Sequence, residues 1–197
     1  MNEKDKQTIN PTSQELRAEL KRAEQTSKYR KTLKSTVFSL ITVAAVAVLI
    51  ATIFLPVFQI YGTSMTPTLR DGDVVVSVKH TELQQQDVIA FYYNNKILVK
   101  RVIANSGEWV DIDDNGNVYV NSVKLDEPYV QNKTIGEYDI KFPYQVPEGK
   151  VFVLGDHREV SVDSRNKSVG CVATEQIVGK LVLRIWPVDS IGKINHR

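Results

Sequence analysis

Two residues in this chain have side chains and surroundings that suit covalent chemistry, Ser64 and Lys100. A serine hydroxyl attacks a carbonyl group efficiently only when a neighbouring base takes its proton. Histidine is the usual base, and an uncharged lysine amine is a known replacement for it. A Ser–Lys pair would perform acyl transfer, in which the serine is acylated and water then releases the acyl group.

The residues around Ser64 predict a tight and fixed turn. Gly62 lies two residues before the serine, and Pro67 lies three residues after it. Glycine permits sharp turns and proline fixes its own backbone angle, so together they restrain this segment. Such a turn can present the Ser64 hydroxyl and direct backbone N–H groups toward a developing oxyanion.

Lys100 lies in a segment, residues 97–103, that is typical of a β-strand. Alternation would put Lys100 on one face and Arg101 on the other, so a surface lysine with its amine in water remains an alternative. Catalysis requires a neutral amine, and apolar burial lowers the pKa of lysine from its ordinary value of about 10.4. Lowering that pKa by about 2 units costs roughly 2.7 kcal/mol, which a folded domain can bear.

A charged segment, residues 155–165, follows the apolar run at 151–154. Within it Asp163 and Arg165 could pair and hold the loop, and Ser161 could form a hydrogen bond with an amine. The alternative is a solvated loop without a role in chemistry.

The same segment raises a rival mechanism. Ser64, His157 and Asp156 have the residue types of a conventional catalytic triad. Adjacent aspartate and histidine residues on one loop rarely face each other, and the triad would leave the lysine segment unexplained. The Ser–Lys pair is therefore favoured.

An uncharged apolar stretch precedes Ser64. Residues 35–55 hold no charged side chain, and about 20 such residues span a bilayer. Basic residues cluster just before this stretch, which predicts that the N-terminus is cytoplasmic. A cleaved leader is disfavoured, because the apolar run and the segment ahead of it are both longer than is typical. We therefore predict a cytoplasmic tail at residues 1–34, a single transmembrane anchor at 35–57 in the cell membrane, and an extracytoplasmic catalytic domain at 58–197.

The formal net charge is only +2 and is unevenly distributed. Residues 1–34 carry nine Lys or Arg and five Asp or Glu, whereas residues 58–197 carry 16 and 18. A nucleic-acid partner would need a basic face on the folded part. The composition therefore predicts no nucleic-acid partner and assigns the basic excess to membrane orientation.

The sequence after Pro56 predicts a mainly β fold, with an antiparallel β-sheet catalytic domain behind one transmembrane helix. Runs of β-branched and aromatic residues, separated by turn residues, predict its strands. They lie at residues 73–78, 87–93, 98–103, 118–120, 151–154 and 180–186. Residues 106–145 are more polar and richer in turns, and we expect a small β-rich insertion there.

Metal and redox chemistry are not expected. The single cysteine, Cys171, excludes an internal disulfide and a cysteine-based zinc site, and we expect it to be a buried structural thiol. Residues 111–116 begin like a calcium-binding loop, but the twelfth position is Ser122 where a bidentate glutamate is needed. We expect a hairpin turn there and predict no metal and no cofactor.

Taken in order, the segments that carry these residues resemble those of the bacterial type I signal peptidases, which are membrane-bound endopeptidases with a Ser–Lys dyad. The resemblance extends from the predicted anchor to Trp186 and Pro187. Each segment alone is modest evidence, and their order behind an anchor of this polarity is highly specific. The segments are residues 62–69, 71–75, 99–103, 155–165 and 177–180.

The resemblance implies a role for each candidate residue. Ser64 would be the nucleophile, and its backbone N–H would be one oxyanion donor. Lys100 would be the general base, and Ser161 would orient its amine. Asp163 and Arg165 would form a structural ion pair beside the site.

The chain departs from the common pattern at a few positions. Some relatives carry a hydroxyl side chain two residues before the serine, whereas other relatives share the glycine that this chain has there, Gly62. The second oxyanion donor would therefore be a backbone N–H, a water or Thr63. The family commonly has asparagine where His157 stands, and the spacing from Arg165 to Gly170 is about one residue longer than usual.

By the same resemblance the substrate is an exported preprotein, whose N-terminal signal peptide is removed at an Ala-X-Ala-type site. The precursor would lie extended beside residues 58–61 and add a strand to them. Its small side chains would enter shallow apolar pockets, although the pocket residues could equally be ordinary core. The candidate pocket residues are Phe58, Ile60, Met65, Leu69, Leu98 and Val99. The implied partners are signal peptides and the lipid bilayer.

Two other classes of protein stay open. A self-cleaving cytoplasmic repressor uses the same Ser–Lys chemistry, but this chain has a predicted anchor and no DNA-binding domain. A catalytically silent assembly factor would have no need of both dyad residues.

Overall fold

The computed structural model describes residues 13–79 and 82–194 of the chain. The first twelve residues of the predicted cytoplasmic tail therefore lie outside the described residues. The chain divides between Ala51 and Thr52 into two compact units.

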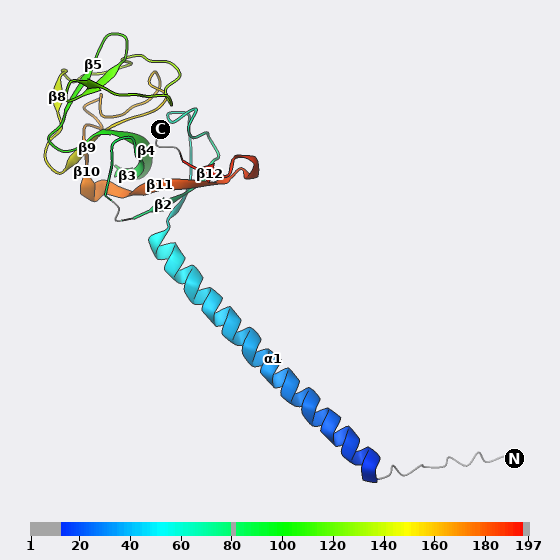
Figure 1. Cartoon of the computed structure of the whole chain (residues 1–197). Helices are drawn as coiled ribbons and strands as arrows, with labels where there is room; N and C mark the ends of the chain where they lie inside the picture. The colour runs from blue at the N-terminus through cyan, green and yellow to red at the C-terminus, as the bar shows by residue number, and fades with distance from the viewer. Residues whose placement is uncertain (1–12, 80–81, 195–197) are drawn as a thin grey trace. The chain divides into compact units, whose positions relative to one another are not determined.

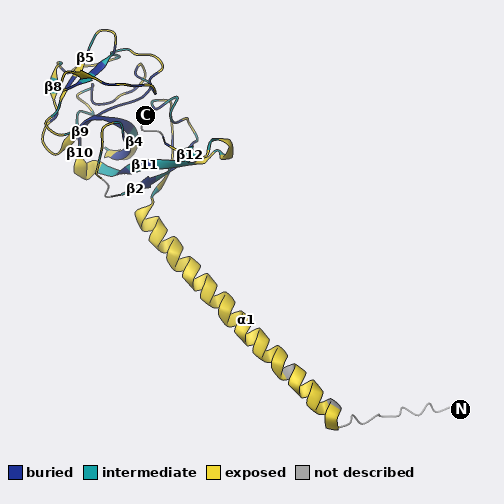
Figure 2. Ribbon diagram, viewed as in Figure 1, coloured by how far each residue is buried: buried dark blue, intermediate teal, exposed yellow. Residues whose placement is uncertain are grey.

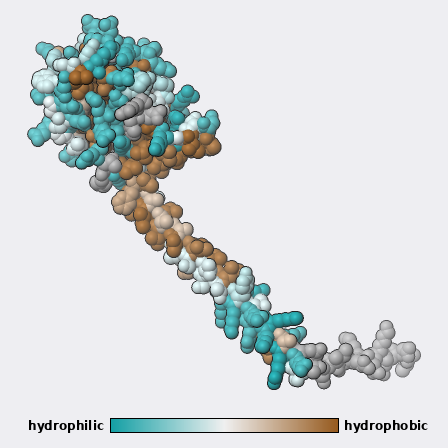
Figure 3. Space-filling view, viewed as in Figure 1, coloured by the Kyte–Doolittle hydropathy of each residue, from teal (hydrophilic) through white to brown (hydrophobic). Residues whose placement is uncertain are grey.

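The N-terminal unit is built on one helix, α1 (Ser13–Phe54), which is long and apolar enough to cross a membrane by length and composition. Figure 3 shows that its residues change from hydrophilic to hydrophobic along its length. Its described side chains are exposed, as Figure 2 shows. The helix ends at Phe54, because Pro56 disfavours helical backbone at Leu55. Residues 55–57 of the predicted anchor thus lie beyond it.

The second unit has a mainly antiparallel β fold, as predicted (Figure 1). Its main sheet has eight strands, and β4 lies inside it with a partner on each side. The order is β1 (Val57–Gln59), β2 (Val74–Val78), β11 (Ile177–Trp186), β3 (Val88–Tyr93), β4 (Lys96–Ala104), β9 (Lys150–Leu154) and β10 (Val172–Ala173), with β12 (Gly192–Lys193) paired to β11. Two short 3₁₀ helices, η1 (Thr174–Gln176) and η2 (Val188–Ser190), flank β11.

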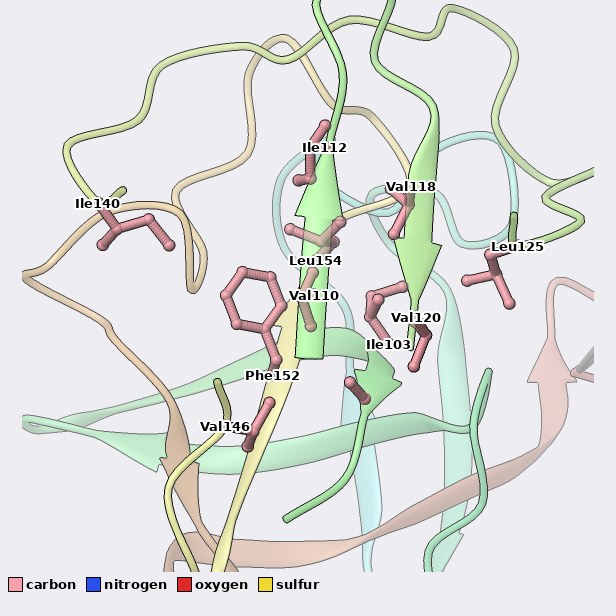
Figure 4. Packing of buried hydrophobic residues seen from close by; sticks show 11 residues of the cluster. Ile103, Val110, Ile112, Val118, Val120, Leu125, Ile140, Val146, Phe152 and Leu154 are labelled. Carbon is pink, nitrogen blue, oxygen red and sulfur yellow. The ribbon is translucent and has the colours of Figure 1, made fainter. Parts of the chain in front are cut away.

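A second, four-stranded sheet lies between β4 and β9 in the sequence. Its order is β7 (Val123–Lys124), β6 (Val118–Val120), β5 (Trp109–Ile112) and β8 (Tyr144–Gln145). β5 and β6 form the predicted hairpin. Figure 4 shows side chains of these two strands meeting Phe152 and Leu154 of β9 in one buried cluster. This cluster ties the second sheet to the strands that carry the candidate site.

The main sheet is covered by apolar residues on both faces. Along β3, Val88 and Ala90 pack into one buried cluster, while Ile89 and Phe91 pack into another. Successive side chains of a strand point to opposite faces, so β3 separates two cores. On the neighbouring strand β4, residues 100–104 are all buried, whereas Lys96 and Ile97 at its N-terminal end are exposed.

Candidate active site

Ser64 lies in the connection between β1 and β2. The ends of this connection are joined by backbone hydrogen bonds, from the Ile60 N–H to the Asp73 carbonyl and from the Gly72 N–H to the Ile60 carbonyl. Met65, next to the serine, is buried in the apolar cluster below. The serine is therefore held by a segment that is fixed at its base and by its buried neighbour.

Gly62 has a left-handed backbone, with φ of 87°. Its N–H donates to Asp71 Oδ1 at 2.7 Å. Glycine adopts this conformation without steric cost, and the aspartate fixes the peptide at the start of the turn that carries Ser64. Sequence reasoning gave Asp71 no role, although its place in a short Asp-Gly-Asp segment was visible.

Lys100 lies on β4, between β3 and β9, and is only 3% exposed. Its Nζ is 2.7 Å from Ser64 Oγ. Burial lowers the pKa of the Lys100 amine from 10.5 to about 8. The negative charges of Asp163 and Asp156 raise this pKa, and the positive charge of Arg165 lowers it further. The amine is therefore neutral in an appreciable fraction of molecules near neutral pH.

The β4–β9 register brings the charged segment to the lysine. Arg101 pairs with Leu154, so the next antiparallel position puts Gly155 opposite Lys100. A Cβ atom at Gly155 would collide with the Ser161 hydroxyl and with the Ser64 carbonyl oxygen. Only glycine allows the three segments to approach this closely.

The Ser161 side chain is buried beside Gly155, at 7% exposure. Its Oγ has no hydrogen-bond partner among the described residues. The structure therefore brings Ser161 to the site without forming the bond to Lys100 that the sequence led us to expect. A buried hydroxyl without a partner is costly, so this oxygen is available to an amine or a water.

Asp163 and Arg165 form an ion pair, with Arg165 Nε 2.8 Å from Asp163 Oδ1. Asp163 Oδ2 also accepts the Gly155 N–H at 3.0 Å. Arg165 donates further to the backbone carbonyls of Ile135, at 2.6 Å, and Arg158, at 2.8 Å. The pair thus pins the loop after β9 and links it to the connection between β7 and β8 of the second sheet.

A buried set of charges that sequence reasoning missed surrounds this loop. Arg101 donates to both carboxylate oxygens of Asp156, at 2.8 and 2.6 Å, and its guanidinium lies 3.8 Å from the ring centre of Tyr129. Arg158 pairs with Glu127. Burial, and then Glu127, raise the pKa of the Tyr129 hydroxyl, so it stays protonated.

The structure does not form a triad of Ser64, His157 and Asp156. The Asp156 carboxylate faces Arg101, and His157 Nδ1 lies 3.1 Å from Thr66 Oγ1. The His157 ring is therefore oriented by the Thr66 hydroxyl, in the turn that carries Ser64.

A cavity of about 110 Å³ adjoins Ser64 and Lys100. Its lining includes the predicted residues Phe58, Ile60, Met65, Leu98 and Val99, together with Ile97 and Tyr61, which were not predicted.

The prediction for Leu69 was wrong. Leu69 does not line the cavity and is fully buried in the same apolar cluster as Met65. The reason is its spacing, since Leu69 lies one helical turn after Met65 and its N–H donates to the Met65 carbonyl.

Cys171 is half-buried rather than buried, and packs against the cluster under the second sheet. Burial raises the pKa of its thiol, which keeps it protonated and poorly nucleophilic.

The chain matches the family described as signal peptidase, peptidase S26, over residues 33–186. It is 34% identical over 178 residues to signal peptidase IB of Staphylococcus aureus strain Mu50, covering 80% of this chain and 92% of that one. It is 34% identical over 151 residues to the chloroplastic thylakoidal processing peptidase 1 of Arabidopsis thaliana, covering 68% and 43%. A solved signal peptidase I of Enterococcus faecalis V583 is 33% identical, with a TM-score of 0.43, over 51% of this chain and 97% of that one.

The family match supports a serine peptidase. The chain belongs to the signal peptidase family, peptidase S26. The reaction of this family is the removal of signal peptides by a serine peptidase.

Proposed function

We propose that this protein is a membrane-anchored endopeptidase that removes signal peptides from exported preproteins at Ala-X-Ala-type sites, with Ser64 as nucleophile and Lys100 as general base. The observation that carries the proposal is the 2.7 Å separation between Ser64 Oγ and the buried Lys100 amine. A base within hydrogen-bond reach and with a pKa near the working pH is what proton abstraction requires.

The reaction proceeds in two acyl-transfer steps. Lys100 takes the Ser64 proton as Oγ bonds to the substrate carbonyl carbon, and the oxyanion accepts a hydrogen bond from the Ser64 N–H. The C–N bond then breaks, and the lysine gives its proton to the departing amine of the mature protein. A water molecule, activated by the Lys100 amine, then hydrolyses the Ser64 ester and releases the signal peptide.

The loop after β9 serves the base in this proposal. The buried Ser161 hydroxyl, which lacks a partner among the described residues, orients the Lys100 amine. The Asp163–Arg165 pair fixes the loop from which Ser161 projects.

The cavity beside Ser64 sets the preference for small side chains. Its volume of about 110 Å³ and its apolar walls, which include Ile60 and Leu98, suit a methyl group. The substrate lies extended against residues 58–61, at the end of the main sheet where β1 stands.

Two features support work at a membrane surface. α1 has the length and composition of a spanning helix, with basic residues ahead of its apolar part, so its N-terminal end is cytoplasmic. The turn from β11 to β12 exposes Trp186, Val188 and Ile191, at 54, 66 and 55%. Figure 3 shows apolar atoms gathered at this end of β12. An exposed apolar patch of this kind is typical of a membrane contact.

The test is cleavage of a purified precursor that carries one Ala-X-Ala site by the full chain in detergent. Wild type should cut it once after the site, and a leucine at the −1 position should block cutting. Ser64→Ala and Lys100→Ala should each lower the rate at least about 100-fold, while His157→Ala should still cut. An active Lys100→Ala with a dead His157→Ala would contradict the dyad. A wild-type protein that cuts no precursor would favour an assembly factor.

A further inference from the structure

The ring of His157 contacts Thr66, in the turn that carries Ser64. Its Nδ1 lies 3.1 Å from Thr66 Oγ1. That hydroxyl donates its one proton to the Thr63 carbonyl, at 2.8 Å. Since a hydroxyl has a single proton, Thr66 Oγ1 can only accept from the histidine. The ring therefore donates from Nδ1.

These contacts fix the peptide that presents the oxyanion donor. The Thr63 carbonyl and the Ser64 N–H belong to one planar peptide unit and point in opposite directions. The carbonyl accepts from both the hydroxyl and the N–H of Thr66, at 2.8 and 3.1 Å. The direction of the Ser64 N–H is therefore set by Thr66, and Thr66 is held by His157.

The next peptide is held by the same residue. The His157 N–H donates to the Ser64 carbonyl at 3.1 Å. Both peptides that flank the serine thus depend on His157, one directly and one through Thr66.

We propose that His157 is a positioning residue, which orients the Ser64 N–H toward the oxyanion by donating from Nδ1 to Thr66. The proposal rests on the proposed function of Ser64 as nucleophile. His157 neither donates nor accepts a proton in this scheme, and Asp156 is engaged by Arg101 rather than by the imidazole.

Three substitutions separate this role from acid–base chemistry. Asparagine places an amide N–H close to the position of Nδ1, glutamine places one further out near Nε2, and alanine has neither. In the full chain, His157→Asn should keep kcat within about twofold of wild type. His157→Gln and His157→Ala should lower kcat about threefold to tenfold, with KM unchanged, because the lost hydrogen bond acts on the transition state.

The partner residue provides the matched comparison. Thr66→Val should lower kcat by the same factor as His157→Ala, and the double variant should lose no more than either one. Thr174 is a suitable control, because its hydroxyl also donates to a backbone carbonyl, that of Gly149, on another loop. Thr174→Val should leave kcat unchanged.

A second readout does not depend on cleavage. The ¹⁵N shifts of the imidazole, identified by their loss in His157→Asn, should show a protonated Nδ1 in the neutral ring. A neutral ring protonated at Nε2 would overturn the proposal, as would full activity of His157→Ala. Loss of activity in His157→Asn comparable to Ser64→Ala would overturn it in favour of a catalytic imidazole. If wild type cuts no precursor, the proposed function fails, and the ring shifts still decide the contact.

Discussion

Arg158 and Glu127 form an ion pair whose side chains are both almost completely buried, at 1 and 0% exposure. Glu127 belongs to the connection between β7 and β8 of the second sheet, and Arg158 to the loop that follows β9. The pair therefore joins the second sheet to the loop that carries Ser161.

Removal of one partner should destabilise the fold strongly. Glu127→Ala leaves the Arg158 guanidinium buried without its carboxylate, which costs about 3–5 kcal/mol. Urea unfolding followed by circular dichroism would measure the loss. Asp126→Asn is the matched control, because Asp126 is the exposed neighbour and its change should stay within about 0.5 kcal/mol. Equal effects of the two substitutions would show that the pair contributes nothing.

Cleavage should rise with pH and level off above about 8. The Lys100 amine has a pKa of about 8, and only its neutral form can take the Ser64 proton. The measurement is kcat/KM for a precursor peptide between pH 6 and 10, since this ratio reports the free enzyme. Lys100→Arg should be inactive throughout, because guanidinium stays charged. A rate that falls between pH 7 and 9 would contradict the assignment.

The buried lysine should also lower the stability of the folded chain. Its pKa falls from 10.5 to about 8, which corresponds to about 3 kcal/mol. The sign follows from proton binding, since between these values the unfolded chain is protonated and the folded chain is not. The penalty is complete below pH 8 and disappears toward pH 10.5. Lys100→Met should therefore be more stable than wild type at pH 7, with the gap in unfolding free energy closing by pH 10. A gap that is constant with pH would exclude this origin.

Glycine should be required at position 155. A methyl group there would collide with Ser161 and with the Ser64 carbonyl, so Gly155→Ala should cost about 1–3 kcal/mol and lower cleavage at least about tenfold. Gly192→Ala is the comparison, because a Cβ at Gly192 meets nothing within 4 Å. Both variants would be compared by urea unfolding and precursor cleavage. Normal cleavage by Gly155→Ala would show that the three segments can separate without loss.

The strands could be predicted from the sequence, and Ser64 and Lys100 could be singled out as a pair, because the signals for both are local. In the strand at 98–103 four of the six residues are β-branched or aliphatic, and Ser64 lies between a glycine and a proline that restrict the backbone. Leu69 was misplaced because an apolar residue near the serine suits a pocket and a core equally well. Only the helical turn that begins at Met65 decides between them.

The burial of Arg101 and Arg158 could not be predicted, since arginine is ordinarily a surface residue. Alternation placed Arg101 on the face opposite Lys100 and did not indicate whether that face is buried. Asp156 and Tyr129, from segments remote in the sequence, enclose it. Such a contact depends on the register of β4 with β9, which no local pattern encodes. The same is true of the bond between His157 and Thr66, which joins residues 91 positions apart.

β1 has only three residues, and in the described part of the chain it pairs with β2 alone. A polypeptide that docks on its outer edge can form few backbone hydrogen bonds, and each contributes little net free energy in water. Docking through this edge is therefore weak and reversible. In the proposed function, a short edge of this kind would favour departure of the cut chain after the reaction.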